Sequence, residues 1–537
     1  MKAKETTLQS TIYTGGSIFT ADRDNLDVEA ILVEGERIRA TGALDHVKAL
    51  SSSSNRTVDL GGAFLAPGFN DNHTHPPKFG ESLFQIDASP RTVPTLQRLL
   101  DAFRASASSN GAAEWIIGRG YDDTRLDVHR HPTRDELDQV SAEQPILLVR
   151  TCGHLGVANS AALAAAGISG TTPDPQGGQI DRDQHGRATG LLRETALKLV
   201  QRVEPRPTRA DIARYLTSAG NVFLSQGITS VADASITRLE QLSAYQDLAR
   251  SCELPFRVYT MMLIDDMLDT LSSLGIQTGF GDEWVRIGPA KVFQDGSGGG
   301  RTAAMFDAYR DQPDNYGITY YSQDELNERF GRAHDAGFQL AAHAIGDRAI
   351  TMILDAYEHA LGDDIVTDHR ARIEHCGMCT PAILERLKRI GVFAAPQPTF
   401  IHYLGDSYLE NFSDVQLEHA YPLRSFQEYG IPYSLSSDVP VTPCASMINL
   451  HAAVTRRTQD GATMGDRQGI SVEEALIAYT FGGAYGSREE TLKGTLRPGA
   501  LADIVVLSAD PRTVDPDDIR KITVQQTILG GDVRYEA

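Results

Sequence analysis

The chain has 537 residues, of which 41% are hydrophobic and 23% charged, a globular composition with room for one barrel-sized domain and one or two smaller ones. Its 71 Asp and Glu outnumber its 50 Lys and Arg, and the formal net charge of -21 argues against nucleic acid or a membrane surface as partner. No apolar run is long enough to span a bilayer, and the first 16 residues lack a signal-peptide core, so we expect a cytoplasmic protein.

Both ends of the chain are rich in short β-type runs separated by turns. Residues 11–42 alternate apolar runs with Gly and Asp-Asn turns, as a hairpin or meander does, and residues 494–537 show the same pattern. We therefore expect residues 1–66 and 490–537 to form one small β-sandwich domain together.

The long middle of the chain, residues 67–489, alternates apolar strands with amphipathic segments. Two of these segments, 322–337 and 380–391, open with residues that commonly cap helices. Strands alternating with helices indicate an α/β fold, and eight strands predict a (β/α)8 TIM barrel. The expected strands are the run before His73 and residues 227–234, 256–263, 285–297, 338–346, 371–376, 391–397 and 431–438.

The stretch between the first and second expected strands is too long for a single crossover. Residues from about 80 to 210 carry their own apolar runs, such as "AEWIIGRGYDD" (113–123) and "PILLVRTC" (145–152). A structureless loop of that length would be unusual in a compact domain. We therefore predict a subdomain inserted after barrel strand 1.

His73 and His75, in "PGFNDNHTH" (67–75), follow the first expected strand. Residues i and i+2 of a strand point to the same face, so the two imidazoles could hold one metal ion, although a surface turn would have the same sequence pattern. Active sites of (β/α)8 barrels lie at the carboxyl ends of the strands, so we expect ligand-type side chains at later strand ends to converge with them. These later side chains are Lys291, His343, His375 and Asp438.

The residue types at these positions suit divalent ions. Imidazole and carboxylate groups bind zinc and similar metals. A neutral lysine amine can react with carbon dioxide to give an anionic carbamate that could bridge two ions, and burial beside cations would favour the neutral amine of Lys291. Taken singly, each residue could equally be a structural histidine, a solvated lysine or a helix cap.

The sequence resembles the amidohydrolase superfamily, in the branch called amidohydrolase family 3. The motifs that carry the resemblance are spread over almost the whole chain. They are "PGFNDNHTH", "KVFQDGSGGGRTAAM" (291–305), "AAHAIGDRAI" (341–350), "RIEHC" (372–376), "SSDVPVTP" (436–443) and "GTLRPGALADIVVLS" (494–508).

This resemblance implies a metal-dependent hydrolase with one or two divalent ions, zinc foremost, that cleaves a non-peptide C–N bond. Asp438 would be the general acid and base for attack by a metal-activated hydroxide, protonating the leaving nitrogen. The six predicted side chains would be the metal ligands, with His73, His75 and Asp438 on the more buried ion, His343 and His375 on the second, and a carboxylated Lys291 between them.

Six residues are predicted to contact the substrate. In the insert, Tyr121 could instead pack a core and His154 cap a helix. Arg301, after the glycine-rich run 296–300, could bind a substrate carboxylate or be a solvated surface residue. Gln397 is expected to face the pocket from the seventh strand. The full set is Tyr121, Asp122, His154, Asp295, Arg301 and Gln397.

Relatives in this branch include N-substituted formamide deformylases, so the expected partner is a small-molecule substrate such as an N-substituted formamide or N-acyl amine. The same site could instead open a cyclic amide or a lactone, or deaminate an aminated ring. A non-catalytic metal-binding protein is a further alternative, and a homodimer is expected from the relatives. The five cysteines form no disulfide framework, and the CxxC pair Cys376 and Cys379 is expected to hold buried or bystander thiols.

Overall fold

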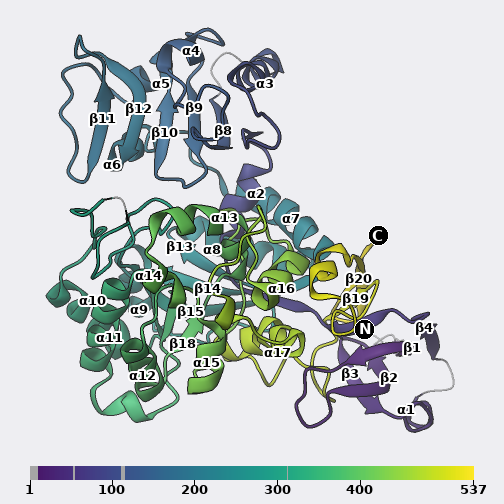
Figure 1. The fold of residues 1–537 in the computed structure, drawn as a ribbon. Coiled ribbons are helices and arrows are strands. Elements are labelled where there is room, and N and C mark those ends of the chain that lie inside the picture. Colours follow the sequence, from purple (N-terminus) through teal and green to yellow (C-terminus); the bar gives the residue numbers. More distant parts are fainter. Residues whose placement is uncertain (1–9, 52–54, 110–114, 311) are drawn as a thin grey trace. The chain divides into compact units, whose positions relative to one another are not determined.

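The computed structural model describes residues 10–51, 55–109, 115–310 and 312–537 (Figure 1). The chain divides into two compact units, Met1–Pro76 with Leu216–Ala537, and Pro77–Tyr215. The insertion predicted at about 80–210 falls within the range of the second unit. Residues 1–9, on which part of the signal-peptide prediction was based, lie outside the described residues.

Seven parallel strands form a nearly closed barrel in the first unit, in the order β6-β13-β14-β15-β16-β17-β18. Every residue of β13 (Ile228–Ile236) is buried, because a barrel strand is covered on both faces. The seven strands match the first seven predicted ones within a few residues at each end. The other six strands are β6 (Phe69–Thr74), β14 (Arg257–Leu263), β15 (Val285–Phe293), β16 (Leu340–Ala344), β17 (Arg372–His375) and β18 (Phe393–Ala395).

The eighth predicted strand, residues 431–438, is not a regular strand in the structure. Tyr433 forms an isolated bridge to Ala394 of β18, and further along Asp438 N donates to His73 O at 2.9 Å. The segment therefore bonds to both neighbouring strands without a continuous ladder. Pro432 is its second residue and Pro440 follows it by two, and a proline has no N–H to donate to a ladder.

The helices of this unit begin and end where the sequence has capping residues. Ser322 and Glu325 form a capping box at the start of α10 (Gln323–Asp335). Thr380 caps α12 (Pro381–Ile390), and Gly391, with φ of 82°, ends it in the left-handed conformation. In Figure 1, α9 to α12 lie together beside the barrel strands. The remaining α-helices are α8 (Leu239–Arg250), α9 (Ile264–Ser273), α11 (Asp347–Leu361), α13 (Pro398–Asn411), α14 (Asp414–Glu418), α15 (Leu423–Tyr429), α16 (Ser446–Thr455), α17 (Val472–Ile477) and α18 (Gly483–Gly486), with a π-helix over Ala478–Gly482.

The two ends of the chain contribute to one continuous eight-stranded sheet, where the sequence led us to expect a sandwich. Its order is β21-β20-β19-β5-β1-β2-β3, with β4 paired to β1. The core of the sheet mixes Ile18 and Val33 from the N-terminal part with Ile504 and Ile528 from the C-terminal part. Its elements are β1 (Ser10–Phe19), β2 (Asp27–Glu34), β3 (Arg37–Gly42), α1 (Leu44–Leu50), β4 (Arg56–Asp59), β5 (Phe64–Pro67), β19 (Ile504–Leu507), β20 (Val524–Leu529) and β21 (Asp532–Glu536).

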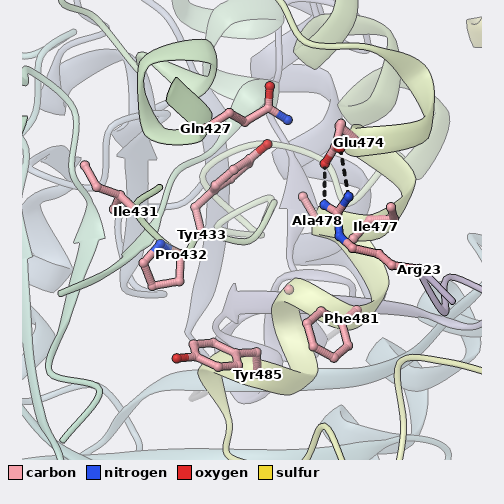
Figure 2. A pocket seen from close by; sticks show the side chains of 11 residues that line it. Arg23, Gln427, Ile431, Pro432, Tyr433, Glu474, Ile477, Ala478, Phe481 and Tyr485 are labelled. Atoms are coloured by element: carbon pink, nitrogen blue, oxygen red, sulfur yellow. Dashed lines mark hydrogen bonds and ion pairs between the residues drawn. The ribbon is translucent and has the colours of Figure 1, made fainter. Parts of the chain in front are cut away.

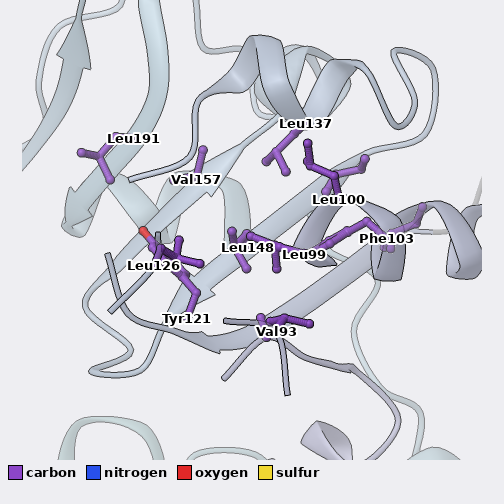
Figure 3. Close-up of a cluster of buried hydrophobic side chains, with 13 residues drawn as sticks. Val93, Leu99, Leu100, Phe103, Tyr121, Leu126, Leu137, Leu148, Val157 and Leu191 are labelled. Carbon is purple, nitrogen blue, oxygen red and sulfur yellow. The ribbon is translucent and has the colours of Figure 1, made fainter. Parts of the chain in front are cut away.

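The second unit is built on a six-stranded sheet in the order β11-β12-β10-β9-β8-β7. Successive residues of a strand face opposite sides, so on β9 (Ile146–Arg150) Leu147 and Leu148 belong to different apolar clusters. Figure 3 shows the cluster of Leu148, which Phe103 of α3 (Leu96–Ser109) covers. The other elements are β7 (Ile86–Asp87), β8 (Ile116–Tyr121), α4 (Arg134–Asp138), β10 (Leu155–Ala158), α5 (Ser160–Ala165), β11 (Gly178–Arg182), β12 (Ala188–Glu194) and α6 (Thr195–Gln201), with α2 (Pro76–Ser82) and α7 (Arg209–Ser225) at its boundaries.

Candidate metal centre

The ends of the barrel strands bring the predicted histidine ligands together. His73 lies in β6, His343 in β16, and His375 is the last residue of β17. The ring centroid of His375 is 4.7 Å from that of His73 and 4.3 Å from that of His343. The ring of His75 is 5.6 Å from the ring of His73. Four imidazoles that are far apart in the sequence therefore form one cluster.

Asp438 completes a group of three with His73 and His75. One carboxylate oxygen and two imidazole nitrogens of these residues all lie within 4.8 Å of one another. Asp438 Oδ1 is 3.4 Å from His73 Nε2 and 3.1 Å from His75 Nε2, yet among the described residues it makes no hydrogen bond. Atoms that approach this closely without hydrogen-bond geometry suit a common central cation, so the donor set fits a divalent ion.

Each of the four histidines has one ring nitrogen in contact with a different oxygen atom of the protein. A neutral imidazole has one N–H and one lone pair, so an oxygen acceptor on one nitrogen leaves the other nitrogen free to bind a metal. Three of the four partners are side chains, and one is a backbone carbonyl. The pairs are His73 Nδ1 with Glu374 Oε2 (2.5 Å), His75 Nδ1 with Ser235 Oγ (2.9 Å), His375 Nδ1 with Gln397 Oε1 (2.7 Å) and His343 Nε2 with Gly296 O (3.0 Å).

Two of the candidate ligands have left-handed backbone conformations. The φ angles are 70° at His375 and 58° at Asp438, values that few residues other than glycine adopt and that cost about 1–3 kcal/mol each. An unbroken strand would turn Glu374 and His375 to opposite faces. With the left-handed backbone at His375, the side chains of Glu374 and His375 both contact His73. Strain of this kind persists where the surrounding structure requires it, as at functional sites.

Lys291 is a buried lysine whose amine makes no hydrogen bond in the described part of the chain. Burial lowers its pKa from 10.5 to about 8, although the negative charges of Glu374 and Asp438 act to raise it. At pH 7 about a tenth of such an amine is neutral, several hundred times more than for an ordinary lysine. The unpaired amine fits the predicted carboxylated bridge, because only a neutral amine reacts with carbon dioxide.

The charge states of the other groups suit metal binding. Burial, followed by the charges of His343 and His73, holds the pKa of His375 well below its usual range, so its imidazole is neutral at pH 7. Burial alone would raise the pKa of Asp438, but His73 and His75 outweigh it and hold that pKa well below its usual range. The cluster therefore offers a neutral imidazole at His375 and an ionised carboxylate at Asp438.

Two predicted substrate contacts near the cluster have other partners in the structure. Asp295 accepts hydrogen bonds from the backbone N–H groups of Ala304, Ile345 and Gly346, at 2.8 to 3.3 Å, so its carboxylate holds the loop after β15. The amide of Gln397 is fully buried and positions His375, while its nitrogen donates to Ala395 O and Ser436 Oγ.

Arg301, a further predicted substrate contact, uses only part of its guanidinium group for hydrogen bonds to the described residues, as its Nε bond shows. Its Nε donates to Asn411 Oδ1 at 2.7 Å, and Asn411 in turn donates to the carbonyls of Gly298 and Gly299. The guanidinium is therefore tied to the glycine-rich loop by one edge. Within residues 115–310 and 312–537 its two terminal nitrogens make no hydrogen bond, so they can serve an acceptor.

The three predicted contacts in the second unit lie within its own framework. Tyr121 is fully buried in the cluster of Figure 3, and its hydroxyl pairs with His131 Nδ1 at 2.9 Å. Asp122 Oδ1 accepts from Thr124 and from Arg150. These contacts correspond to the packing role that the sequence left open for Tyr121. The partly exposed His154 pairs through Nδ1 with Glu194 at 2.9 Å.

Sequence reasoning missed three residues of the site: Ser235, Arg372 and Glu374. Glu374 and Arg372 are fully buried and paired, Arg372 Nε donating to Glu374 Oε1 at 2.5 Å. Their spacing in "RIEH" puts both on one face of β17, and two opposite charges two positions apart in a short strand were the available signal. Ser235 had no such signal.

A separate pocket of about 450 Å³ lies beside the start of the 431–438 segment (Figure 2). Ile431, Tyr433 and Phe481 line it. Arg23 and Glu474 also line it and form a bidentate ion pair, with hydrogen bonds of 2.8 and 3.1 Å. No predicted site residue lines this pocket.

All five cysteines are free, and Cys376 and Cys379 are buried, as expected from the sequence. Their sulfur atoms lie 3.4 Å apart. The described part of the chain contains no helix that is both long and apolar enough to cross a membrane.

Comparison with known proteins agrees with the geometry of the site. Residues 56–535 match the amidohydrolase family. The chain belongs to the amidohydrolase family. It is 30% identical to the Bacillus subtilis protein YtcJ, which carries an amidohydrolase name, over 98% of this chain and 99% of that protein. The N-substituted formamide deformylase of Arthrobacter pascens is 28% identical, with 99% of each chain covered.

A solved structure extends this agreement to the fold. An uncharacterised metal-dependent hydrolase from Pyrococcus horikoshii superposes with a TM-score of 0.80 and 27% identity, over 95% of this chain and 99% of that one. The family and these relatives identify a metal-dependent hydrolase of α/β fold, and the group of His73, His75 and Asp438 offers a place for the metal.

Proposed function

We propose that this hydrolase cleaves the C–N bond of a small-molecule amide, with an N-substituted formamide as its substrate. The observation that carries the proposal is the arrangement of the four histidines, each held by an oxygen at one ring nitrogen. The similarity to the deformylase of Arthrobacter pascens over nearly the full length of both chains supports the substrate class.

The proposed site holds one or two divalent ions, with zinc the best match to its imidazole-rich ligands. His73, His75 and Asp438 would hold one ion, His343 and His375 would hold the other, and Lys291, when carboxylated, would supply a further ligand. An ion bound there polarises a carbonyl and lowers the pKa of water toward neutrality. The chain itself fixes the imidazoles and supplies the proton carrier.

Asp438 is the proposed proton carrier. Its ionised carboxylate accepts a proton from the attacking water and delivers it to the amide nitrogen as the C–N bond breaks. A formamide then yields formate and a primary amine, and the carboxylate returns to its starting state. The side chains of His75 and His343 are 11% and 12% exposed, against 1% for His73, so substrate approaches from their side.

The test combines metal analysis with hydrolysis of a panel of compounds. Wild type and Lys291→Ala are compared with Lys388→Ala, a matched control at an exposed lysine whose amine donates to a backbone carbonyl, Gly430 O. We expect about two metal equivalents and amine release in wild type and control, with both reduced in Lys291→Ala.

The panel separates the substrate classes. Formate released from N-substituted formamides supports the proposal, whereas release of ammonia from an aminated ring or opening of a lactone would replace it. A full complement of metal without turnover of any compound would favour a binding protein. One metal equivalent that is unchanged in Lys291→Ala would remove the lysine bridge. Light scattering of the same samples tests the expected homodimer.

A further inference from the structure

The four histidines of the cluster differ in the charge of their oxygen partners. The oxygens that hydrogen-bond His75, His343 and His375 belong to a hydroxyl, a carbonyl and an amide, all neutral. Asp295 Oδ1 also lies near His343 Nε2, but at the longer distance of 3.4 Å. His73 instead has a carboxylate oxygen of Glu374 as the hydrogen-bond partner of its Nδ1, at 2.5 Å. An anionic acceptor strengthens the hydrogen bond and makes the opposite ring nitrogen a better electron donor to a metal.

Glu374 is itself held from behind by a cation. Arg372 Nε donates to Glu374 Oε1 at 2.5 Å, and Arg372 Nη2 donates to Glu374 Oε2 at 3.1 Å. The same Nη2 donates to Asn72 O at 2.8 Å, in the residue that precedes His73. The arginine therefore fixes both the carboxylate and the backbone of the strand that carries the histidine.

This arrangement joins two strands that lie apart in the sheet. β17 carries Arg372 and Glu374, β6 carries Asn72 and His73, and the sequence separation is about 300 residues. All four residues are at most 2% exposed. A buried carboxylate with two charged or polar partners has no freedom to turn away from the imidazole.

We propose that Glu374, held by Arg372, is a positioning residue that fixes the orientation and proton of His73 and thereby sets the affinity of the metal site. We call the chain of hydrogen bonds from Arg372 through Glu374 to His73 the relay, and the other ring nitrogen of His73 would bind the metal. The inference rests on the proposed metal site but not on the identity of the substrate. It assigns to "RIEH" a second role beside that of His375.

A structural role is the competing explanation, since Glu374 also neutralises a buried arginine. Three variants separate the two explanations. Glu374→Gln keeps the shape and removes the charge. The double variant Arg372→Met with Glu374→Gln removes both charges, and buried ion pairs often tolerate replacement by uncharged groups of similar size. Asp503→Asn is the matched control, because Asp503 pairs with Arg257 at 2.7 Å with 5% and 1% exposure and contacts no histidine of the cluster.

The measurements are the dissociation constant of zinc, by competition with a chelator, and the visible spectrum of the cobalt-loaded protein. We expect zinc binding to weaken about 10- to 100-fold in both Glu374→Gln and the double variant, with a changed cobalt spectrum. Asp503→Asn should bind zinc as wild type does, although it melts at a lower temperature. Neither readout depends on catalytic activity.

Two results would overturn the relay alone. One is wild-type zinc affinity in Glu374→Gln, and the other is affinity restored in the double variant, which would show that Glu374 only compensates for Arg372. A wild-type protein that binds no zinc or cobalt would overturn the proposed metal site together with the relay.

Discussion

Replacing Lys291 by methionine tests whether its amine is an unpaired buried base. The pKa of Lys291 falls from 10.5 to about 8 because burial outweighs the attraction of Glu374 and Asp438. Between these two pH values the unfolded chain binds a proton that the folded chain does not, so stability rises with pH there. The loss of folding stability caused by burying this charged amine is therefore fully present below pH 8, and it disappears as the pH rises to 10.5. A shift of this size corresponds to about 3 kcal/mol at pH 7.

Methionine fills a similar volume without a charge. For a chain of this length, about 1 kcal/mol shifts the melting temperature by roughly 1 °C. We therefore expect metal-free Lys291→Met to melt roughly 3 °C above the metal-free wild type at pH 7. The difference should shrink by pH 10, and the variant should have lost hydrolysis at any pH.

Calorimetry of chelator-treated protein at pH 7 and pH 10 measures both effects. Lys493→Met is the matched control, because Lys493 is equally buried but paired with Glu489 at 2.8 Å. Breaking that pair leaves the buried carboxylate of Glu489 facing the more distant Arg286, at 3.8 Å, so the control should melt at a lower temperature than wild type. If Lys291→Met is less stable than wild type at pH 7, or if the gap persists at pH 10, the amine is not the unpaired base described here.

Three further predictions follow from the contacts of the site and the insert. Removal of metal by a chelator should abolish hydrolysis, and divalent ions should restore it; activity that survives metal-free dialysis contradicts the proposed chemistry. Tyr121→Phe should lower stability by about 1 kcal/mol through loss of the bond to His131, with KM unchanged, whereas a raised KM would indicate substrate contact. Asp295→Asn should lower stability by about 1–3 kcal/mol, because backbone N–H groups lose an acceptor. A raised KM in an equally stable Asp295→Asn protein would place this carboxylate on the substrate.

The sequence predicted the barrel strands well because their signal is local. β13 reads as an uninterrupted buried run, and Ser322, Thr380 and Gly391 end or begin helices by contacts within a few residues. The 431–438 segment was mispredicted as a regular strand for a related reason. Its apolar and small residues suit a strand, but its hydrogen bonds depend on β18 and β6, which lie elsewhere in the sequence.

The candidate ligands were also accessible from the sequence, because histidine, lysine and aspartate at successive strand ends form a recognisable series. Their orientation was not. Gln397 was predicted to face the substrate, and the structure shows its amide against His375. Asp295 was given the same role, and backbone donors surround its carboxylate.

By itself, the sequence determined the first seven barrel strands and the side chains of metal-binding type at their ends, since these depend on residue type and on spacing over a few positions. Only the tertiary structure decided which oxygen holds each imidazole. The partner of His73 lies 301 residues away and that of His75 lies 160 residues away. The left-handed backbone at His375 likewise has no local signal in its sequence. Such contacts form only when strands distant in the chain close into one barrel, because the direction of a side chain is set by what packs against it.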